Sequence, residues 1–234
     1  MILLKELKKF IKSILSWIYL LVGFSFLFFL FPPGRSFSLL FFDRIKSDLL
    51  PRGVELIATN PMSAFLAQMV IAFVLAFIVI SPFFIYGIIK YLSPALYKKE
   101  KGVLLKLVIP SAFLFVGGSI FSYFFIIPPS FEILYSFTTA MGALPFFTVG
   151  EFVYSVLGLI LAVGIMFLLP VFMGILSRLG IFPPGFWKNN WRYAFLVFLI
   201  FSAIITPDGT GITMTILAIP LVGLYGLGMI VSRR

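Results

Sequence analysis

Uncharged stretches bounded by charged residues recur along the whole chain. A bilayer core is about 30 Å thick, and a helix needs roughly 20 apolar residues to cross it. Five of the stretches reach that length, and the fifth in order, 193–207, is shorter. Little chain is left for a separate globular domain, so the pattern predicts an all-α polytopic membrane protein forming a single domain over 1–234. The stretches lie between Lys12 and Arg35, Glu55 and Lys90, Lys106 and Glu132, Glu151 and Arg178, Arg192 and Asp208, and Asp208 and Arg233.

Six transmembrane helices follow from this pattern, several of them interrupted by proline. Proline removes a backbone donor and bends a helix, so we expect kinks at Pro82, Pro170 and Pro220 and a concave bundle. Ordinary packing variation is the alternative, because membrane helices tolerate proline. The glycine pair 117–118 and Gly223, Gly226 and Gly228 permit close helix approach. The expected helices cover about 13–32, 62–92, 103–127, 150–176, 192–206 and 211–231.

Two longer loops are expected on one side of the membrane. In 36–50, Phe37, Phe41, Ile45 and Leu49 recur at helical spacing, which predicts an amphipathic helix at the interface or over the bundle. Segment 128–150 opens with two prolines and carries a weaker version of the same pattern. Both loops are interpreted as covers for the bundle, with contact to a substrate as the alternative.

The basic residues are distributed very unevenly between the two sides. One side, which holds both termini, has fourteen lysines and arginines, and the other has only Arg35, Arg44, Lys46 and Arg52. The positive-inside rule therefore places both termini in the cytoplasm. The net charge of +10 is explained by topology and by contact with anionic headgroups, so nucleic-acid binding is not expected.

Composition narrows the chemistry further. Hydrophobic residues make up 62% of the chain and charged residues 11%, and there is no cysteine and no histidine. Disulfides, thiol nucleophiles, imidazole or thiolate metal sites and histidine acid–base schemes are thereby excluded. We expect no enzyme, no cofactor and no metal. The basic and then apolar N-terminus is interpreted as a retained first span rather than a cleaved signal peptide.

The eight acidic residues are the informative polar set. None lies at mid-depth of a predicted span, where an ion-coupled transporter would need one. Only Glu6 and Glu100 are cytoplasmic, and each lies inside a lysine cluster. At 100° per residue Glu6 borders the apolar stripe of its helix and faces away from open water. A local pair with lysine or a favourable helix-dipole contact would explain Glu6 equally well.

Several short motifs follow one another along nearly the whole chain. The most specific is Pro94-Ala95-Leu96-Tyr97 followed by Glu100-Lys101, and Leu4-x-Glu6-Leu7-Lys8 stands near the N-terminus. The others are Ser81-Pro82, Phe121-x-Tyr123, Pro128, Gly164-Ile165-x-Phe167-x-x-Pro170, Thr206-Pro207-Asp208 and Leu217-Ala218-Ile219-Pro220. Together they resemble the TatC family, the multispanning subunit of the twin-arginine protein translocase, whose signatures include P-A-L-Y-x-x-E-[KR] and an N-terminal H-L-x-E-L-R.

The resemblance implies a receptor in the cell membrane. Such a protein binds the paired arginines of signal peptides of folded cargo at its cytoplasmic face. It assembles with itself and with single-span TatA/TatB-type proteins and is driven by the proton gradient. Glu6 and Glu100 stand at the arginine-binding positions, and Lys8 and Tyr91 match neighbouring positions of the same face. Asp208 matches an acid of the outer T-P-x-D motif and is a candidate functional acid.

The chain departs from the family pattern at a few positions. Leu3 replaces the N-terminal histidine and Lys8 replaces an arginine. Leu168 replaces an intramembrane glutamate that is implicated in docking the single-span partners, and Gly226 replaces another glutamate. Two other function classes remain open at this stage: a small-solute or ion transporter, and a membrane scaffold that does not bind signal peptides.

Overall fold

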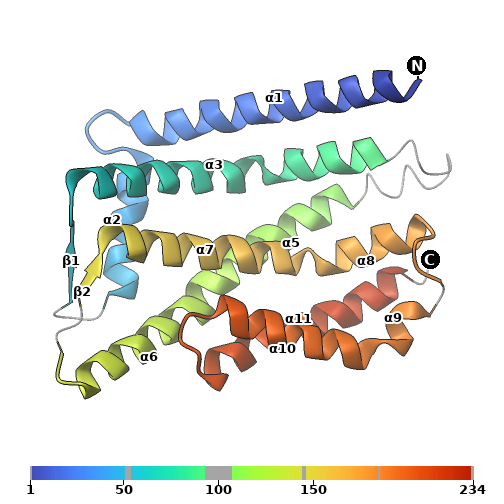
Figure 1. Ribbon diagram of the computed structural model, residues 1–234. Coiled ribbons are helices and arrows are strands. Elements are labelled where there is room, and N and C mark those ends of the chain that lie inside the picture. The colour runs from blue at the N-terminus through green and yellow to red at the C-terminus, as the bar shows by residue number, and fades with distance from the viewer. Residues whose placement is uncertain (1, 51–53, 93–106, 144–145, 184, 233–234) are drawn as a thin grey trace.

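The computed structural model describes residues 2–50, 54–92, 107–143, 146–183 and 185–232, with the backbone alone described at 2–14 and 88–92. Long helices dominate these residues (Figure 1). In order they are α1 (Ile2–Leu30), α2 (Phe37–Leu49), α3 (Pro61–Leu92), α5 (Val108–Phe121), the π-helical segment η2 (Ser122–Ile126), α6 (Ile127–Ala140), α7 (Val149–Phe167), α8 (Leu169–Arg178), α9 (Phe186–Asn189), α10 (Trp191–Ile205) and α11 (Gly211–Ser232). Two short strands, β1 (Glu55–Ile57) and β2 (Phe146–Thr148), complete the fold.

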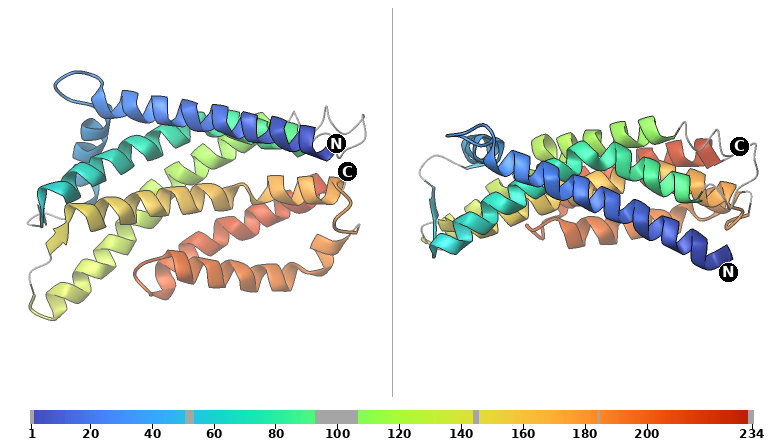
Figure 2. Two further views of the ribbon diagram at one scale, coloured as in Figure 1. Left: turned by 45° about the horizontal axis from the view of Figure 1, so that its top comes forward. Right: turned by 90° about the horizontal axis from the view of Figure 1, so that it is seen from above.

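The long helices form a membrane bundle with α7 at its centre. Helix α1 packs on α3, α3 and α5 pack on α7, and α8 and α10 pack on α11. Figure 1 shows α5, η2 and α6 crossing the bundle obliquely, and both views in Figure 2 keep the two termini at one end. Phe152, Val153, Val156 and Val163 of α7 are fully buried. Helices α3 and α5 therefore pack directly on α7, whose buried side chains form the centre of the hydrophobic core.

Each of the six predicted spans contains helix. Pro61–Gly87, Val108–Ala140, Val149–Arg178 and Gly211–Ser232 are long and apolar enough to cross a membrane. The part of α1 whose side chains are described, Leu15–Leu30, is also apolar, and α10 (Trp191–Ile205) is the short stretch that the charge spacing indicated.

The prediction was wrong about the end of the third helix. The chain stays helical through Pro128 and Pro129 to Ala140, so most of the predicted loop 128–150 is helix α6. Neither proline can donate a hydrogen bond to the preceding turn. A π-helical turn precedes them, in which Ile127 N–H donates to Ser122 C=O, and α6 begins with the prolines in its first turn. Proline is tolerated there because the N–H groups of the first turn have no intrahelical acceptor, so the missing proline N–H costs no hydrogen bond.

The fourth span is broken where Pro170 requires it. α7 ends at Phe167 and α8 begins at Leu169, with Pro170 in its first turn. Pro82 and Pro220 instead lie inside the uninterrupted helices α3 and α11, so kinks at these two positions stay a prediction.

The end of the bundle opposite the termini is covered as predicted by a helix, and also by a small sheet. α2 buries Ile45 and Leu49 against the bundle. Tyr123 Oη donates to Asp48 Oδ2 at 2.7 Å, and Arg44 Nε lies 2.9 Å from the same oxygen. β1 pairs in parallel with β2, with Leu56 opposite Phe147. The all-α prediction did not include this sheet, which ties the two covering segments together.

Candidate functional site

The predicted signal-peptide residues belong to the end of the molecule that carries both termini. Glu6 and Lys8 lie in the first turns of α1, and Tyr91 lies in the last turn of α3; only their backbone is described. Glu100 lies outside the described residues. The described ends of α3 and α5 that flank its segment both lie at this same end (Figure 1). The fold therefore brings the N-terminal turns of α1 and the C-terminal turn of α3 to one end of the bundle.

A close contact holds α1 against α3 near that end. A Cβ atom at Gly87 would lie 2.7 Å from Trp17 Nε1 and 3.2 Å from its Cε2, so only glycine lets the indole lie on the α3 backbone. The Trp17 ring also lies 6.2 Å from the Phe83 ring, centroid to centroid. Gly87 lies one turn before Tyr91. The contact consequently sets the position of the N-terminal half of α1 relative to the end of α3.

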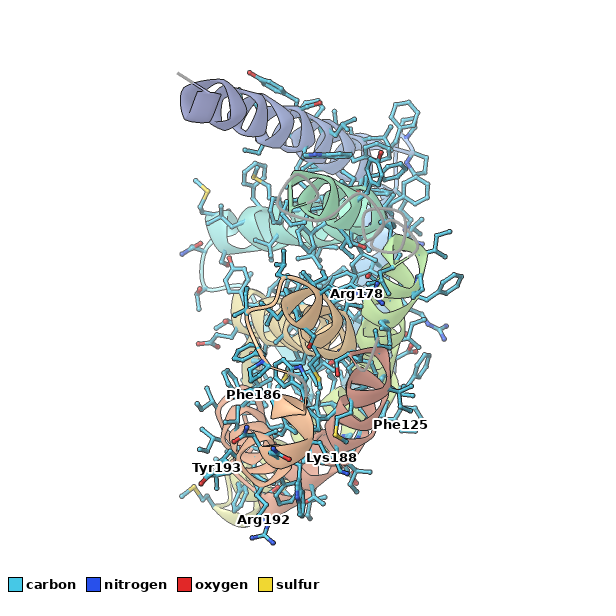
Figure 3. The ribbon with its side chains drawn as sticks, turned by 90° about the vertical axis from the view of Figure 1, so that its right-hand side faces the viewer. Phe125, Arg178, Phe186, Lys188, Arg192 and Tyr193 are labelled. Atoms are coloured by element: carbon cyan, nitrogen blue, oxygen red, sulfur yellow. The ribbon has the colours of Figure 1, made fainter. Side chains whose placement is uncertain are left out.

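The described charged side chains at this end are basic. Figure 3, which looks onto this end, labels Arg178 of α8, Lys188 of α9 and Arg192 of α10. The ion pairs of the described residues, Arg35–Asp43 and Arg44–Asp48, belong to α2 and the loop before it at the opposite end. A cationic peptide would therefore be repelled here unless carboxylates outside the described side chains, such as those of Glu6 and Glu100, faced it.

Asp208 occupies a buried turn between α10 and α11. Its side chain accepts hydrogen bonds from the Thr213 hydroxyl at 2.5 Å, from the Thr210 hydroxyl, and from Thr210 N–H at 3.3 Å. Desolvation by burial raises the pKa of this carboxyl. The hydrogen bonds from Thr210 and Thr213 stabilise the ionised form by more than that, so the net effect is a pKa below its ordinary value. These contacts hold the turn that starts α11. A functional role for Asp208 beyond them stays a prediction.

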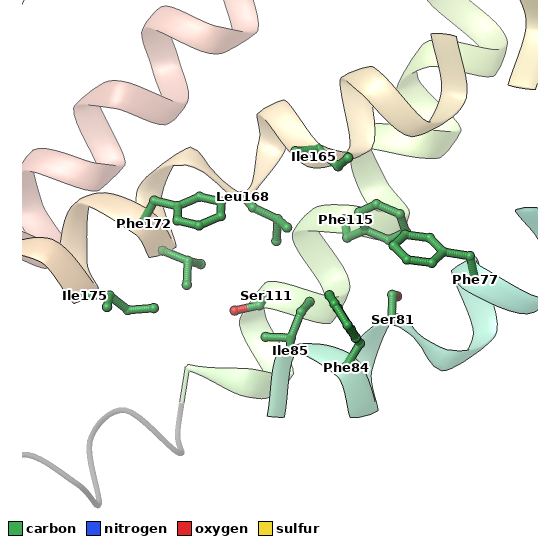
Figure 4. Close-up of a pocket in the computed structure, with 11 residues that line it drawn as sticks. Phe77, Ser81, Phe84, Ile85, Ser111, Phe115, Ile165, Leu168, Phe172 and Ile175 are labelled. Atoms are coloured by element: carbon green, nitrogen blue, oxygen red, sulfur yellow. The ribbon is translucent and has the colours of Figure 1, made fainter. Parts of the chain in front are cut away.

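The sequence did not reveal an apolar pocket beside the break between α7 and α8. The pocket has a volume of about 220 Å³ and lies between α3, α5 and the α7–α8 junction (Figure 4). Leu168, which stands at the glutamate position of the family motif, contributes to its wall. Ser81 and Ser111 also line it, but their hydroxyls donate to Ile78 C=O at 2.8 Å and to Leu107 C=O at 2.5 Å. The pocket consequently offers almost no free polar group. The nearby prolines 82, 110 and 170 were the only sequence signal for it.

Comparisons with known proteins agree on one family. Residues 3–220 match the family model described as Sec-independent protein translocase protein (TatC). The chain is 40% identical over 192 residues to the Sec-independent protein translocase protein TatC of Cenarchaeum symbiosum (strain A), covering 82% of this chain and 73% of that protein. It is 29% identical over 233 residues to the protein of the same name from Aquifex aeolicus (strain VF5), covering 98% of this chain and 92% of that one. A crystal structure of the twin-arginine translocase receptor TatC superposes with a TM-score of 0.76 at 28% identity, over 98% of this chain and 97% of the other.

Proposed function

This chain belongs to the TatC family of Sec-independent protein translocase subunits, and we propose that it binds twin-arginine signal peptides through Glu6 and Glu100. As a family member it is a multi-pass membrane protein of the twin-arginine transport pathway and a non-enzymatic component. One observation carries the proposal. The N-terminal turns of α1 and the C-terminal turn of α3 lie at the same end of the bundle, and the described charged side chains at that end are all basic.

The chemistry of recognition follows from that electrostatic setting. A guanidinium group forms two parallel hydrogen bonds with a carboxylate, and each bond to a charged group is worth about 1.5–3 kcal/mol. Two carboxylates among lysines favour a pair of arginines, because each guanidinium then gains a carboxylate partner that offsets its repulsion by the surrounding lysines. Lys8 stands at the basic position of the N-terminal motif. Tyr91 supplies an aromatic surface on which the peptide packs.

The orientation and the partners belong to the same proposal. Both termini and this end of the bundle face the cytoplasm of the cell membrane, supported by the fourteen basic residues assigned to that side against four on the other. All six helical segments cross the membrane, the short α10 included. The protein then assembles with other copies and with TatA/TatB-type single-span partners, driven by the proton gradient.

The family assignment removes the support for a small-solute or ion transporter. Such a transporter would also need a charged group at mid-depth of a membrane span, and no described carboxylate lies at such a position. A scaffold that retains the fold without binding a signal peptide makes a different prediction from a receptor. A receptor crosslinks to a twin-arginine peptide through Glu6 and Glu100, and a scaffold does not.

The experiment is site-specific photocrosslinking of a twin-arginine signal peptide to the full-length protein in membranes. We expect Glu6→Gln and Glu100→Gln each to lower crosslinking about tenfold or more, since each removes a charge-assisted pair worth at least about 1.5 kcal/mol. Replacing the paired arginines of the peptide by lysines should lower it similarly, because lysine cannot bond in the bidentate geometry.

Glu132→Gln is the matched control. Glu132 is an exposed glutamate in α6, at the opposite end of the bundle. The control should crosslink at the wild-type level. If Glu6→Gln and Glu100→Gln insert normally and also crosslink like the wild type, the assigned site is wrong.

A further inference from the structure

The pocket beside the α7–α8 break is suited to one apolar chain. Phe84, Ile85, Phe115, Leu168 and Ile175 line it, and its serine hydroxyls are satisfied by their own helices. An apolar cavity of this kind does not hold water stably. All of its walls come from helices long and apolar enough to span a membrane, so hydrocarbon is the surrounding solvent. Figure 4 shows the lining side chains converging on this space.

The extent of the pocket along the membrane normal matches one leaflet. Ile165 and Ile175 both line it and lie ten residues apart, which corresponds to about 15 Å along a helix. That is half of a bilayer core about 30 Å thick. Ile165 is 50% exposed and Phe172 is 52% exposed, so the pocket is open sideways to its surroundings. A chain entering from the bilayer would therefore run from the membrane interface to mid-depth.

Arg178 is a cationic group one turn beyond Ile175, the last residue of α8 that lines the pocket, and one of its N–H groups has no hydrogen-bond partner within the described part of the chain. Arg178 follows Ile175 by three residues, so both side chains lie on the same face of α8, one turn apart. Its Nε atom is buried and has no hydrogen-bond partner among the described residues. In Figure 3 Arg178 lies beside α8, at the end of the molecule that carries the termini. A buried guanidinium N–H without an acceptor is costly, so this geometry favours an anionic ligand.

We propose that this pocket and Arg178 form a binding site for an anionic phospholipid. One acyl chain fills the space between α3, α5 and α8, and the phosphate of the headgroup accepts from the Arg178 guanidinium. Phosphate oxygens suit the planar donors of arginine, and basic pockets between transmembrane helices are typical sites for acidic headgroups. Because Leu168 keeps the wall apolar, hydrocarbon fits this pocket better than a polar segment of another protein does.

The test measures phospholipid binding to the full-length, detergent-solubilised protein by native mass spectrometry. The probes are dioleoyl phosphatidylglycerol and dioleoyl phosphatidylcholine, which share acyl chains and differ in headgroup charge. We expect the wild type to retain the anionic lipid more tightly. Arg178→Gln should lower the affinity for phosphatidylglycerol about tenfold and bring it to the level of phosphatidylcholine. Ile165→Trp should fill the mouth of the pocket and weaken both lipids.

Each variant has a control of the same kind outside the site. Arg192→Gln removes an exposed arginine at the same end of the molecule, and Ile200→Trp enlarges an isoleucine of α10 that is also 50% exposed. Both controls should bind lipid like the wild type, and thermal unfolding verifies that all four variants are folded. Equal binding of the two lipids by the wild type, an unchanged affinity in Arg178→Gln, or equal effects of Ile165→Trp and Ile200→Trp would each overturn the site.

Discussion

Two adjacent glycines in α5 are expected to respond in opposite directions to the same substitution. A Cβ at Gly118 would lie 2.7 Å from Phe167 Cγ, 2.8 Å from its Cβ and 3.0 Å from Gly164 Cα. At Gly117 no heavy atom lies within 4 Å of the added carbon. Carbon atoms prefer separations of about 3.5–4.0 Å, so Gly118→Ala must push α5 away from the α7 backbone. Gly117→Ala adds a methyl group in open space.

The magnitude follows from that geometry. Overpacking typically costs about 1–3 kcal/mol, and here one of the contacts is backbone, which cannot rotate aside. Phe167 also has little freedom, because its ring packs 5.5 Å from that of Phe121. Alanine in place of glycine favours a helix by up to about 1 kcal/mol, which applies unopposed at Gly117. Since the same helix-propensity gain applies at Gly118, the overpacking cost is the difference, and Gly118→Ala should be about 1–3 kcal/mol less stable than Gly117→Ala.

Thermal unfolding of the purified protein, followed by size-exclusion chromatography of the heated samples, measures this difference. At about 2–4 °C per kcal/mol for a chain of this size, the two variants should differ by about 2–12 °C in Tm. Gly164→Ala tests the other side of the crossing, where the added carbon would lie 2.9 Å from Phe115. Its effect should not add fully to that of Gly118→Ala, because both variants separate the same pair of helices. Equal Tm values for the Gly117 and Gly118 variants would refute the close crossing of α5 and α7.

Three further predictions concern other contacts. Gly87→Ala should displace the Trp17 indole and weaken signal-peptide crosslinking. Gly23→Ala, with no heavy atom within 4 Å of the added carbon, should do neither. A change in tryptophan fluorescence in the Gly87 variant alone checks this. Asp208→Asn should destabilise the protein by about 1.5–3 kcal/mol at neutral pH. Because the pKa of Asp208 is lowered in the folded state, this stabilisation is fully present above the unfolded-state pKa and is lost as the pH falls through the folded-state pKa. The free energies of unfolding of wild type and variant, measured by denaturant titration, should therefore converge as the pH falls below about 4. Tyr123→Phe removes the 2.7 Å hydrogen bond to α2 and should speed hydrogen exchange in α2 while leaving α7 protected; equal exchange in wild type and variant would count against that anchor.

Which helices exist followed from local information, and how they pack did not. Charges bounding the apolar stretches located every long helix, and the period of Ile45 and Leu49 predicted α2 with its buried face. The continuation of the third helix to Ala140 was missed because consecutive prolines usually end a helix. Here a π-helical turn before them and burial of Phe131 against the core sustain it. The site residues Glu6, Lys8, Tyr91 and Glu100 came from motifs, and their roles remain predictions.

The sequence by itself determined that this is a membrane protein, where most of its helices lie and to which family it belongs. These properties depend on hydropathy and charge along the chain, which neighbours in space do not alter. Only the tertiary structure decided that Gly118 and Gly228 lie at tight crossings while Gly117, Gly223 and Gly226 face open space. It likewise decided that Ile175, one turn before Arg178, lines an apolar pocket. The reason is that a crossing or a cavity depends on which helix faces meet, and residues far apart in the chain contribute those faces.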